Sequence, residues 1–255
     1  MGAQPLNPLA NAGIRWFAIA LLYLAVQPAW DLLGRWMAGW RGRVGAGIAA
    51  LEGASCAEAL RAAGWLVYRV GVPYVALLLG LADAQYLGLA GLTWWPALPL
   101  GAAVGLGSVL LLIWSWGRVA PVLYQRRARR RLFLAERRAL RTSWGWVLLI
   151  VEAVGLQASW AFVRGGAISV AGLYPGVFLG LALVAGVWLL RPGHLAALAN
   201  PDCRAQALLT GELALISGLV FLYSENLWLC ILMHILGLTG AVFAGGRGRA
   251  RAAAD

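Results

Sequence analysis

A succession of apolar runs, each long enough to cross a lipid bilayer, constrains the fold of this chain more than any other feature. We predict seven spans, at about 15–34, 65–82, 99–117, 144–163, 173–190, 205–223 and 227–243. A membrane-spanning helix needs about 20 mainly apolar residues. Because the bilayer core holds no water for unpaired backbone groups, such spans must be helical. The sequence therefore predicts an all-α fold, a polytopic transmembrane helical bundle.

Charged residues are few, and their distribution among the spans predicts an orientation. Only 12% of the residues are charged, against about 25% in a typical soluble domain. The 21 basic residues are all Arg, and most lie in the first, third and fifth loops and the C-terminal tail, whereas Arg164 is assigned to the fourth loop. The positive-inside rule places Arg-rich segments in the cytoplasm. We expect an integral protein of a bacterial inner membrane, with the N-terminus outside and the C-terminus cytoplasmic.

The third loop, "YQRRARRRLFLAERRALRT", is the only long segment of soluble character. It can form a basic helix that sets topology and is attracted to anionic headgroups, by about 1 kcal/mol per Arg near the surface. Docking of a partner's acidic face is the alternative. The net charge of +11 does not indicate nucleic acid, because the charge follows the loops. The residues expected to contact anionic lipid or a partner are Arg126, Arg127, Arg129, Arg130, Arg131, Arg137 and Arg138.

Three ionisable side chains are predicted deep inside spans, where exposure to lipid is costly. Glu152, Glu212 and His234 lie in three different spans, each about 10–13 Å in from the end of the span that is predicted to be cytoplasmic, at about 1.5 Å per residue. Gln157 follows Glu152, and Ser217 follows Glu212, each within the same span. We therefore expect these side chains to form one polar cluster inside the bundle. Small-residue spacings in other spans, at Gly101/Gly105 and Gly176/Gly180, allow close helix approach.

Residue chemistry leaves three roles open for such a cluster. Two carboxylates and a His suffice for general acid–base work on a water molecule. A Glu–His hydrogen bond could instead pin two helices together, which is worth about 1 kcal/mol in membranes. The cluster could also bind a ligand or cofactor, since one His can be the axial ligand of a tetrapyrrole. No metal site is predicted, because zinc usually takes three protein ligands and the three Cys are scattered.

Three stretches follow one another in a distinctive order. "LLIVEAVGLQASWAFVRGG" is followed by "YPGVFLGLALVAGVWLL" and then by "LLTGELALISGLVFLYSENLWLCILMHILGLTGAV". In this order and texture, residues 144–243 resemble the CPBP family of membrane proteins, the CAAX proteases and bacteriocin-processing proteins also called Abi. The resemblance implies two regions: 1–143, with three spans and the Arg-rich loop, and 144–255, with a CPBP-like four-span core and a basic tail.

The resemblance also implies where an active site would lie. The family uses a Glu-Glu-x-x-x-Arg motif, a Phe-x-x-x-His motif and a His-x-x-x-Asn/Asp motif. Glu152 matches the first Glu, but Ala153 and Gln157 replace the second Glu and the Arg. His234 matches the final His, Leu238 replaces its polar partner, and the middle motif lacks its His. Loss of even one oxyanion-stabilising donor typically costs about 3–4 kcal/mol of transition-state stabilisation.

These observations favour a CPBP-like integral membrane protein without protease activity. We expect an accessory or assembly subunit, or a binding protein, within a membrane complex, with membrane lipids and other membrane protein subunits as partners. In that case Glu152, Gln157 and His234 would bind a ligand or pin helices. The alternative is an active CAAX-type endopeptidase that uses Glu152, Glu212 and His234 as catalytic residues. A lesser alternative is pigment or haem binding through His234.

Overall fold

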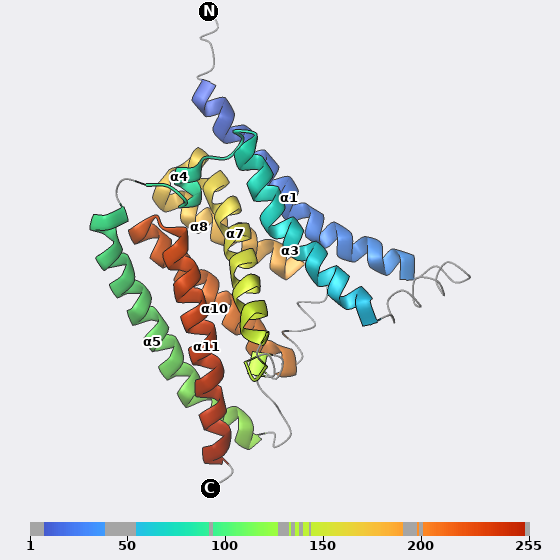
Figure 1. The fold of residues 1–255 in the computed structure, drawn as a ribbon, viewed down its shortest axis with the longest axis vertical. Coiled ribbons are helices and arrows are strands. Elements are labelled where there is room, and N and C mark those ends of the chain that lie inside the picture. Colours follow the sequence, from blue (N-terminus) through green and yellow to red (C-terminus); the bar gives the residue numbers. More distant parts are fainter. Residues whose placement is uncertain are drawn as a thin grey trace, which may run out of the picture.

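Helices form every regular element of the part of the chain that the structure describes. The computed structural model describes residues 8–38, 55–91, 94–126, 133, 136–137, 140–142, 144–190, 198 and 201–252. The helices are α1 (Pro8–Ala38), α3 (Ser55–Leu78), α4 (Ala84–Leu87), α5 (Trp94–Arg126), α7 (Gly145–Ala171), α8 (Leu173–Leu190), α10 (Pro201–Ser224) and α11 (Leu227–Ala252) (Figure 1). The predicted all-α helical bundle is confirmed.

Within the described residues, six helices are long and apolar enough to cross a membrane. Their spans are Ala12–Trp30, Trp95–Ala120, Gly145–Ala171, Leu173–Leu190, Arg204–Ser224 and Leu227–Gly245. The remaining predicted span, 65–82, falls on α3, whose apolar section Ala62–Leu78 is shorter than these six. The chain is therefore an integral membrane protein by the length and composition of its helices.

Several helices end at places that differ from the predicted spans, and α3 and α7 are the two that matter here. α3 stops at Leu78 because Gly80 adopts a positive φ of 67°, and the amide of Leu81 then bonds the carbonyl of Ala76 at 2.9 Å. Glycine reaches this left-handed conformation without steric cost, and so it terminates helices well. α7, in contrast, continues to Ala171 instead of ending near 163. The prediction that Arg164 lies in a loop is therefore wrong, and Arg164 lies inside α7.

α7 is the central helix of the bundle. It packs against α1, α3, α4, α8 and α11, while α5 packs against α10 and α11 (Figure 1). Helices of the regions 1–143 and 144–255 thus pack directly against each other. Successive long helices run in opposite directions, so that α5 and α11 end, and α7 and α10 begin, at the same end of the bundle (Figure 1).

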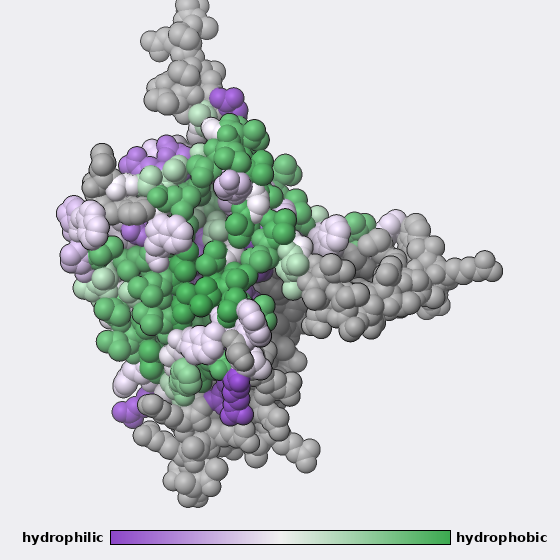
Figure 2. All heavy atoms as spheres, in the orientation of Figure 1, coloured by the Kyte–Doolittle hydropathy of each residue, from purple (hydrophilic) through white to green (hydrophobic). Residues whose placement is uncertain are grey.

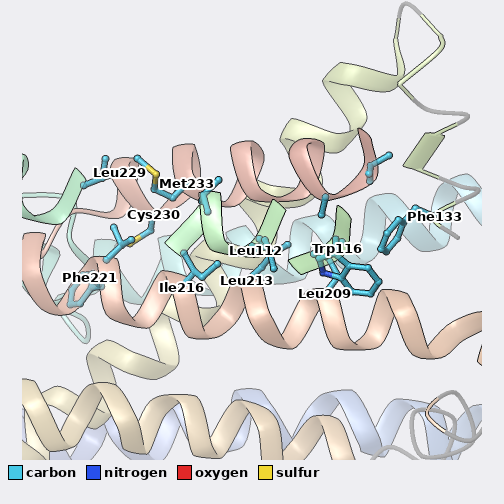
Figure 3. Close-up of a cluster of buried hydrophobic side chains, with 14 of the residues drawn as sticks. Leu112, Trp116, Phe133, Leu209, Leu213, Ile216, Phe221, Leu229, Cys230 and Met233 are labelled. Carbon is cyan, nitrogen blue, oxygen red and sulfur yellow. The ribbon is translucent and has the colours of Figure 1, made fainter. Parts of the chain in front are cut away.

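The apolar core is divided between two clusters. The larger lies among α5, α10 and α11, and its side chains line up along the helices as Figure 3 shows. The second gathers α1 and α3 against α7. On the outside, the drawn face carries a wide apolar belt between more hydrophilic ends (Figure 2). A belt of this kind is what a bilayer requires of a protein surface.

Glycines at these predicted spacings bring helices into close contact. A Cβ on Gly176 would lie 2.4 Å from the Cα of Ile168, and one on Gly180 would lie 2.8 Å from the Cα of Arg164, so α8 sits directly on the backbone of α7. A Cβ on Gly105 of α5 would meet Met233 of α11 at 2.8 Å. These contacts use the small-residue spacing seen in the sequence, which lets membrane helices approach closely.

Candidate functional site

A buried hydrogen-bonded chain of three side chains joins the core helices α7, α10 and α11. The Ser217 hydroxyl donates to Oε1 of Gln157 at 2.7 Å, and Nε2 of Gln157 lies 3.0 Å from Nδ1 of His234. Gln157 is completely buried, and Ser217 and His234 are 2% and 4% exposed. We call these three residues the Gln157 network.

The direction of these bonds fixes the proton on the imidazole. Because Oε1 of Gln157 accepts from Ser217, its Nε2 is the donor toward His234. Nδ1 of His234 must then accept, which places the ring proton of the neutral imidazole on Nε2. Neither ring nitrogen keeps a free lone pair in this arrangement, because one accepts a hydrogen bond and the other carries the proton.

Neighbouring side chains enclose the network. The Trp160 ring lies 5.5 Å from the His234 ring between centroids, and the Cys230 thiol donates to the backbone carbonyl of Ser217 at 3.5 Å. Both residues are buried. The polar groups therefore satisfy one another inside an apolar surround, which is the arrangement that makes a buried polar network stabilising.

The two predicted carboxylates lie outside this network. Glu152 is exposed on α7, since five residues along a helix correspond to a rotation of about 140° away from Gln157. Glu212 is half-buried and accepts a 2.8 Å hydrogen bond from Nε1 of Trp116 on α5. Ser217 stands five residues from Glu212 and is turned away by the same angle. Among the described residues, no hydrogen bond or ion pair joins either carboxylate to His234.

The groups of the Gln157 network suit a structural role better than a catalytic one. The imidazole of His234 is hydrogen-bonded to the amide of Gln157, and beyond it lies the hydroxyl of Ser217. Neither group is a base at ordinary pH, so the network contains no carboxylate that could orient the imidazole or share its proton. Within the described ranges, no group of three His, Cys, Asp or Glu side chains could hold a metal ion. What the three side chains do is link three membrane helices through hydrogen bonds.

The Arg-rich segment is described only in part. Arg126 is the last residue of α5, and Nη2 of Arg137 donates to the carbonyl of Val242 on α11 at 3.4 Å. Beside it, burial raises the pKa of the Glu136 carboxyl above its usual value, and the charge of Glu152 adds to that rise. The other predicted contact residues, Arg127, Arg129, Arg130, Arg131 and Arg138, lie outside the described residues.

Arg164 is a further buried polar residue, which the sequence pattern did not indicate. It is 3% exposed, and its guanidinium carbon lies 3.6 Å from the centre of the Phe221 ring on α10. The signal for it was the run of small and apolar residues that follows, "GGAISVA", which allows the helix to continue past the arginine. Gly165 and Gly166 leave room there for Trp16 of α1.

Comparisons with family models, with curated proteins and with solved structures find no match to this chain. The resemblance of residues 144–243 to the CPBP family therefore stays a prediction. The structure itself defines the class of protein, an all-helical integral membrane bundle with a buried polar core.

Proposed function

We propose that this protein is a CPBP-like membrane protein without protease activity, which serves as an accessory or assembly subunit or a binding protein of a membrane complex. The observation that carries the proposal is the partner of His234. The imidazole is bonded to the amide of Gln157 at 3.0 Å, and the exposed Glu152 is outside the network. Intramembrane hydrolysis needs a base that activates water next to the groups that stabilise the oxyanion, and this arrangement separates them.

The outer faces of several helices support a role within a complex. α1, α5 and α8 keep most of their spanning residues on the outside, and large aromatic side chains such as Trp30, Trp95 and Trp114 are exposed there. These faces contact lipid or the helices of another membrane protein. Membrane lipids and other membrane subunits are therefore the partners that the proposal names.

The proposal includes an orientation in the bacterial inner membrane. The Arg-rich segments connect helix ends that lie at one end of the bundle, where α5 and α11 end and α7 and α10 begin (Figure 1). By the positive-inside rule this end is cytoplasmic. The short α10–α11 turn at Glu225 and Asn226 is then extracytoplasmic.

Native mass spectrometry after gentle solubilisation tests the accessory role. We expect the protein to be released together with one or more other membrane proteins, in a defined stoichiometry. The same preparation is incubated with a prenylated peptide, and no cleavage is expected. A lone chain that cleaves the peptide, and loses this activity on Glu152→Gln substitution, would establish the endopeptidase alternative instead.

The tetrapyrrole alternative is tested on the same preparation. A haem or chlorin would need a ring nitrogen of His234 with a free lone pair, and the bond to Gln157 occupies Nδ1. We expect an absorption spectrum without a Soret or chlorin band. A band that disappears on His234→Gln substitution would overturn this expectation.

A further inference from the structure

The guanidinium of Arg164 is the least compensated polar group in the described bundle. It lies in the middle of the packed helices, with the Phe221 ring 3.6 Å from its central carbon and the backbone of Gly180 against its Cα. Arg164 stands seven residues before the end of α7 at Ala171, about 10 Å along the helix axis. That end is opposite to the end of the bundle where α5 and α11 end, so Arg164 is not at the end proposed as cytoplasmic.

Two of its nitrogen atoms are buried and have no hydrogen-bond partner among the described residues. They are Nε and Nη2. These two atoms share one edge of the planar guanidinium, and their N–H bonds point side by side in the same direction. An edge of this form matches the two oxygens of a carboxylate or phosphate, which it binds through two parallel hydrogen bonds.

The surroundings supply no compensating charge. The Cys230 thiol acts electrostatically on Arg164, but it already donates a hydrogen bond to the backbone carbonyl of Ser217. Phe221 and Cys230 lie at the same end of the core cluster, on facing helices (Figure 3). The ring covers a face of the guanidinium and leaves its edge unsatisfied. A buried charge of this kind is strongly unfavourable unless an opposite charge accompanies it.

We propose that Arg164 anchors an anion-binding site inside the bundle, which takes a single carboxylate or phosphate group on its Nε–Nη2 edge. The oxyanion supplies both missing acceptors and the missing negative charge. The Phe221 ring packs on one face of the planar guanidinium, so that its edge is presented in one orientation. This site goes beyond the accessory role, because it applies equally to an accessory subunit and to a peptidase.

The test measures thermal unfolding of the purified protein against three probes. These are inorganic phosphate, hexanoate as a soluble carboxylate, and phosphatidylglycerol in nanodiscs made otherwise of phosphatidylcholine. At least one probe should raise the unfolding temperature of the wild type until it saturates. A response to phosphatidylglycerol alone assigns the site to a lipid headgroup, whereas a response to phosphate or hexanoate assigns it to a free anion.

Variants at position 164 give the specificity control. Arg164→Met keeps the length of the side chain and should abolish the saturable response. Arg164→Lys keeps the charge but loses the two-nitrogen edge, and its half-saturation should be about tenfold weaker. The matched control is Arg118→Met, which removes an exposed arginine of α5 and should respond like the wild type.

The proposal is overturned if no probe gives a saturable shift for the wild type, or if Arg164→Met responds as the wild type does. Should Arg164→Met not fold, the wild-type titrations and Arg164→Lys still decide between these outcomes. An Arg164→Lys response equal to that of the wild type would also contradict the two-nitrogen edge. None of these results depends on whether the chain cleaves peptides or joins a complex.

Discussion

His234 and Gln157 show how a single hydrogen bond decides what a buried imidazole can do. The side-chain oxygen of Gln157 accepts a hydrogen bond from Ser217, and its nitrogen donates one to His234, so all three groups are paired. Removing the central member leaves two buried polar groups without partners. The loss of pairing costs more than the hydrogen bonds alone, because each group has been taken out of water.

Substitution of Gln157 tests the interpretation that its side chain pairs two buried polar groups. Gln157→Leu should lower the free energy of unfolding by about 1–3 kcal/mol, since His234 and Ser217 remain buried and unpaired. Glu152→Gln on the same helix is the control, and it should change stability by less than about 0.5 kcal/mol because Glu152 is exposed. Both are measured by thermal unfolding in detergent, followed by circular dichroism. Equal destabilisation by the two variants would place Glu152 inside the network.

Glu136 gives the protein a pH dependence of known sign. Its pKa is raised in the folded protein, chiefly by burial. The folded state therefore holds this proton to higher pH than the unfolded chain does. The resulting stabilisation is fully present below the ordinary glutamate pKa of about 4.3 and is lost as the pH rises through the higher folded-state pKa.

A variant that cannot titrate checks this assignment. Glu136→Gln should remove the corresponding fall in unfolding temperature as the pH rises above the ordinary glutamate pKa of about 4.3. Glu225→Gln is the control, since that residue lies at the α10–α11 turn. A wild-type profile that rises with pH over this range, and becomes flat in Glu136→Gln, would reverse the sign and contradict the burial of this carboxyl.

At the scale of the helix, the apolar pattern predicted where most spans lie but not how each is turned. Five-residue spacing separates Glu152 from Gln157 and Glu212 from Ser217, and the helical rotation of about 140° puts the members of each pair on different faces. Equal depth along the helix axis was therefore a poor guide to contact. The depth of a residue could not reveal which face of the helix it occupies, because the rotation of a helix about its axis is set by the packing of its neighbours.

Arg164 was misplaced for a related reason. A charged residue followed by two glycines usually marks the end of a span in a hydropathy profile. Here the helix continues because other helices, and not lipid, surround the arginine, with Phe221 over its guanidinium and Trp16 against the glycines. The CPBP resemblance could not locate Arg164 either, since none of its motifs includes that position.

The contact of α8 with α7 depends on the absence of a side chain. Gly180→Leu should lower the free energy of unfolding by about 1–3 kcal/mol, because its side chain would collide with the backbone at Arg164. Gly186→Leu on the same helix is the matched control, since a Cβ there meets nothing within 4 Å. Comparable losses in thermal stability for the two variants would contradict this packing of α8.

For the whole molecule, the arrangement of helix ends predicts which residues face each side of the membrane. In a variant with Cys56 and Cys203 replaced by Ser, Asp83→Cys should react with an impermeant maleimide in intact cells. Arg141→Cys should react only after permeabilisation, because the Arg-rich end is proposed as cytoplasmic. Buried Cys230 stays in place as an internal control. The reverse labelling pattern would invert the orientation, and labelling of both from outside would show that α5 does not cross.

The number of crossings depends on α3, whose apolar section is the shortest. If α3 crosses, the N-terminus and the C-terminus lie on opposite sides of the membrane. The start of α1 and the end of α11 lie at opposite ends of the bundle in the same way (Figure 1). Reporters fused at each end should therefore give opposite readings, with only the C-terminal one active in the cytoplasm. If both reporters are active on the same side, the number of membrane crossings is six and α3 stays within one leaflet.

The packing of α5 against α10 and α11 has a consequence for biosynthesis. About 100 residues separate the end of α5 from the start of α11, so this helix leaves the ribosome long before its main neighbour exists. At elongation rates of about 5–20 residues per second, the wait lasts about 5–20 s. During that interval α5 is held by lipid or by the insertion machinery. The synthesis of α11 thus completes the packing around α5, and a ribosome that stalls before α11 leaves α5 without this neighbour.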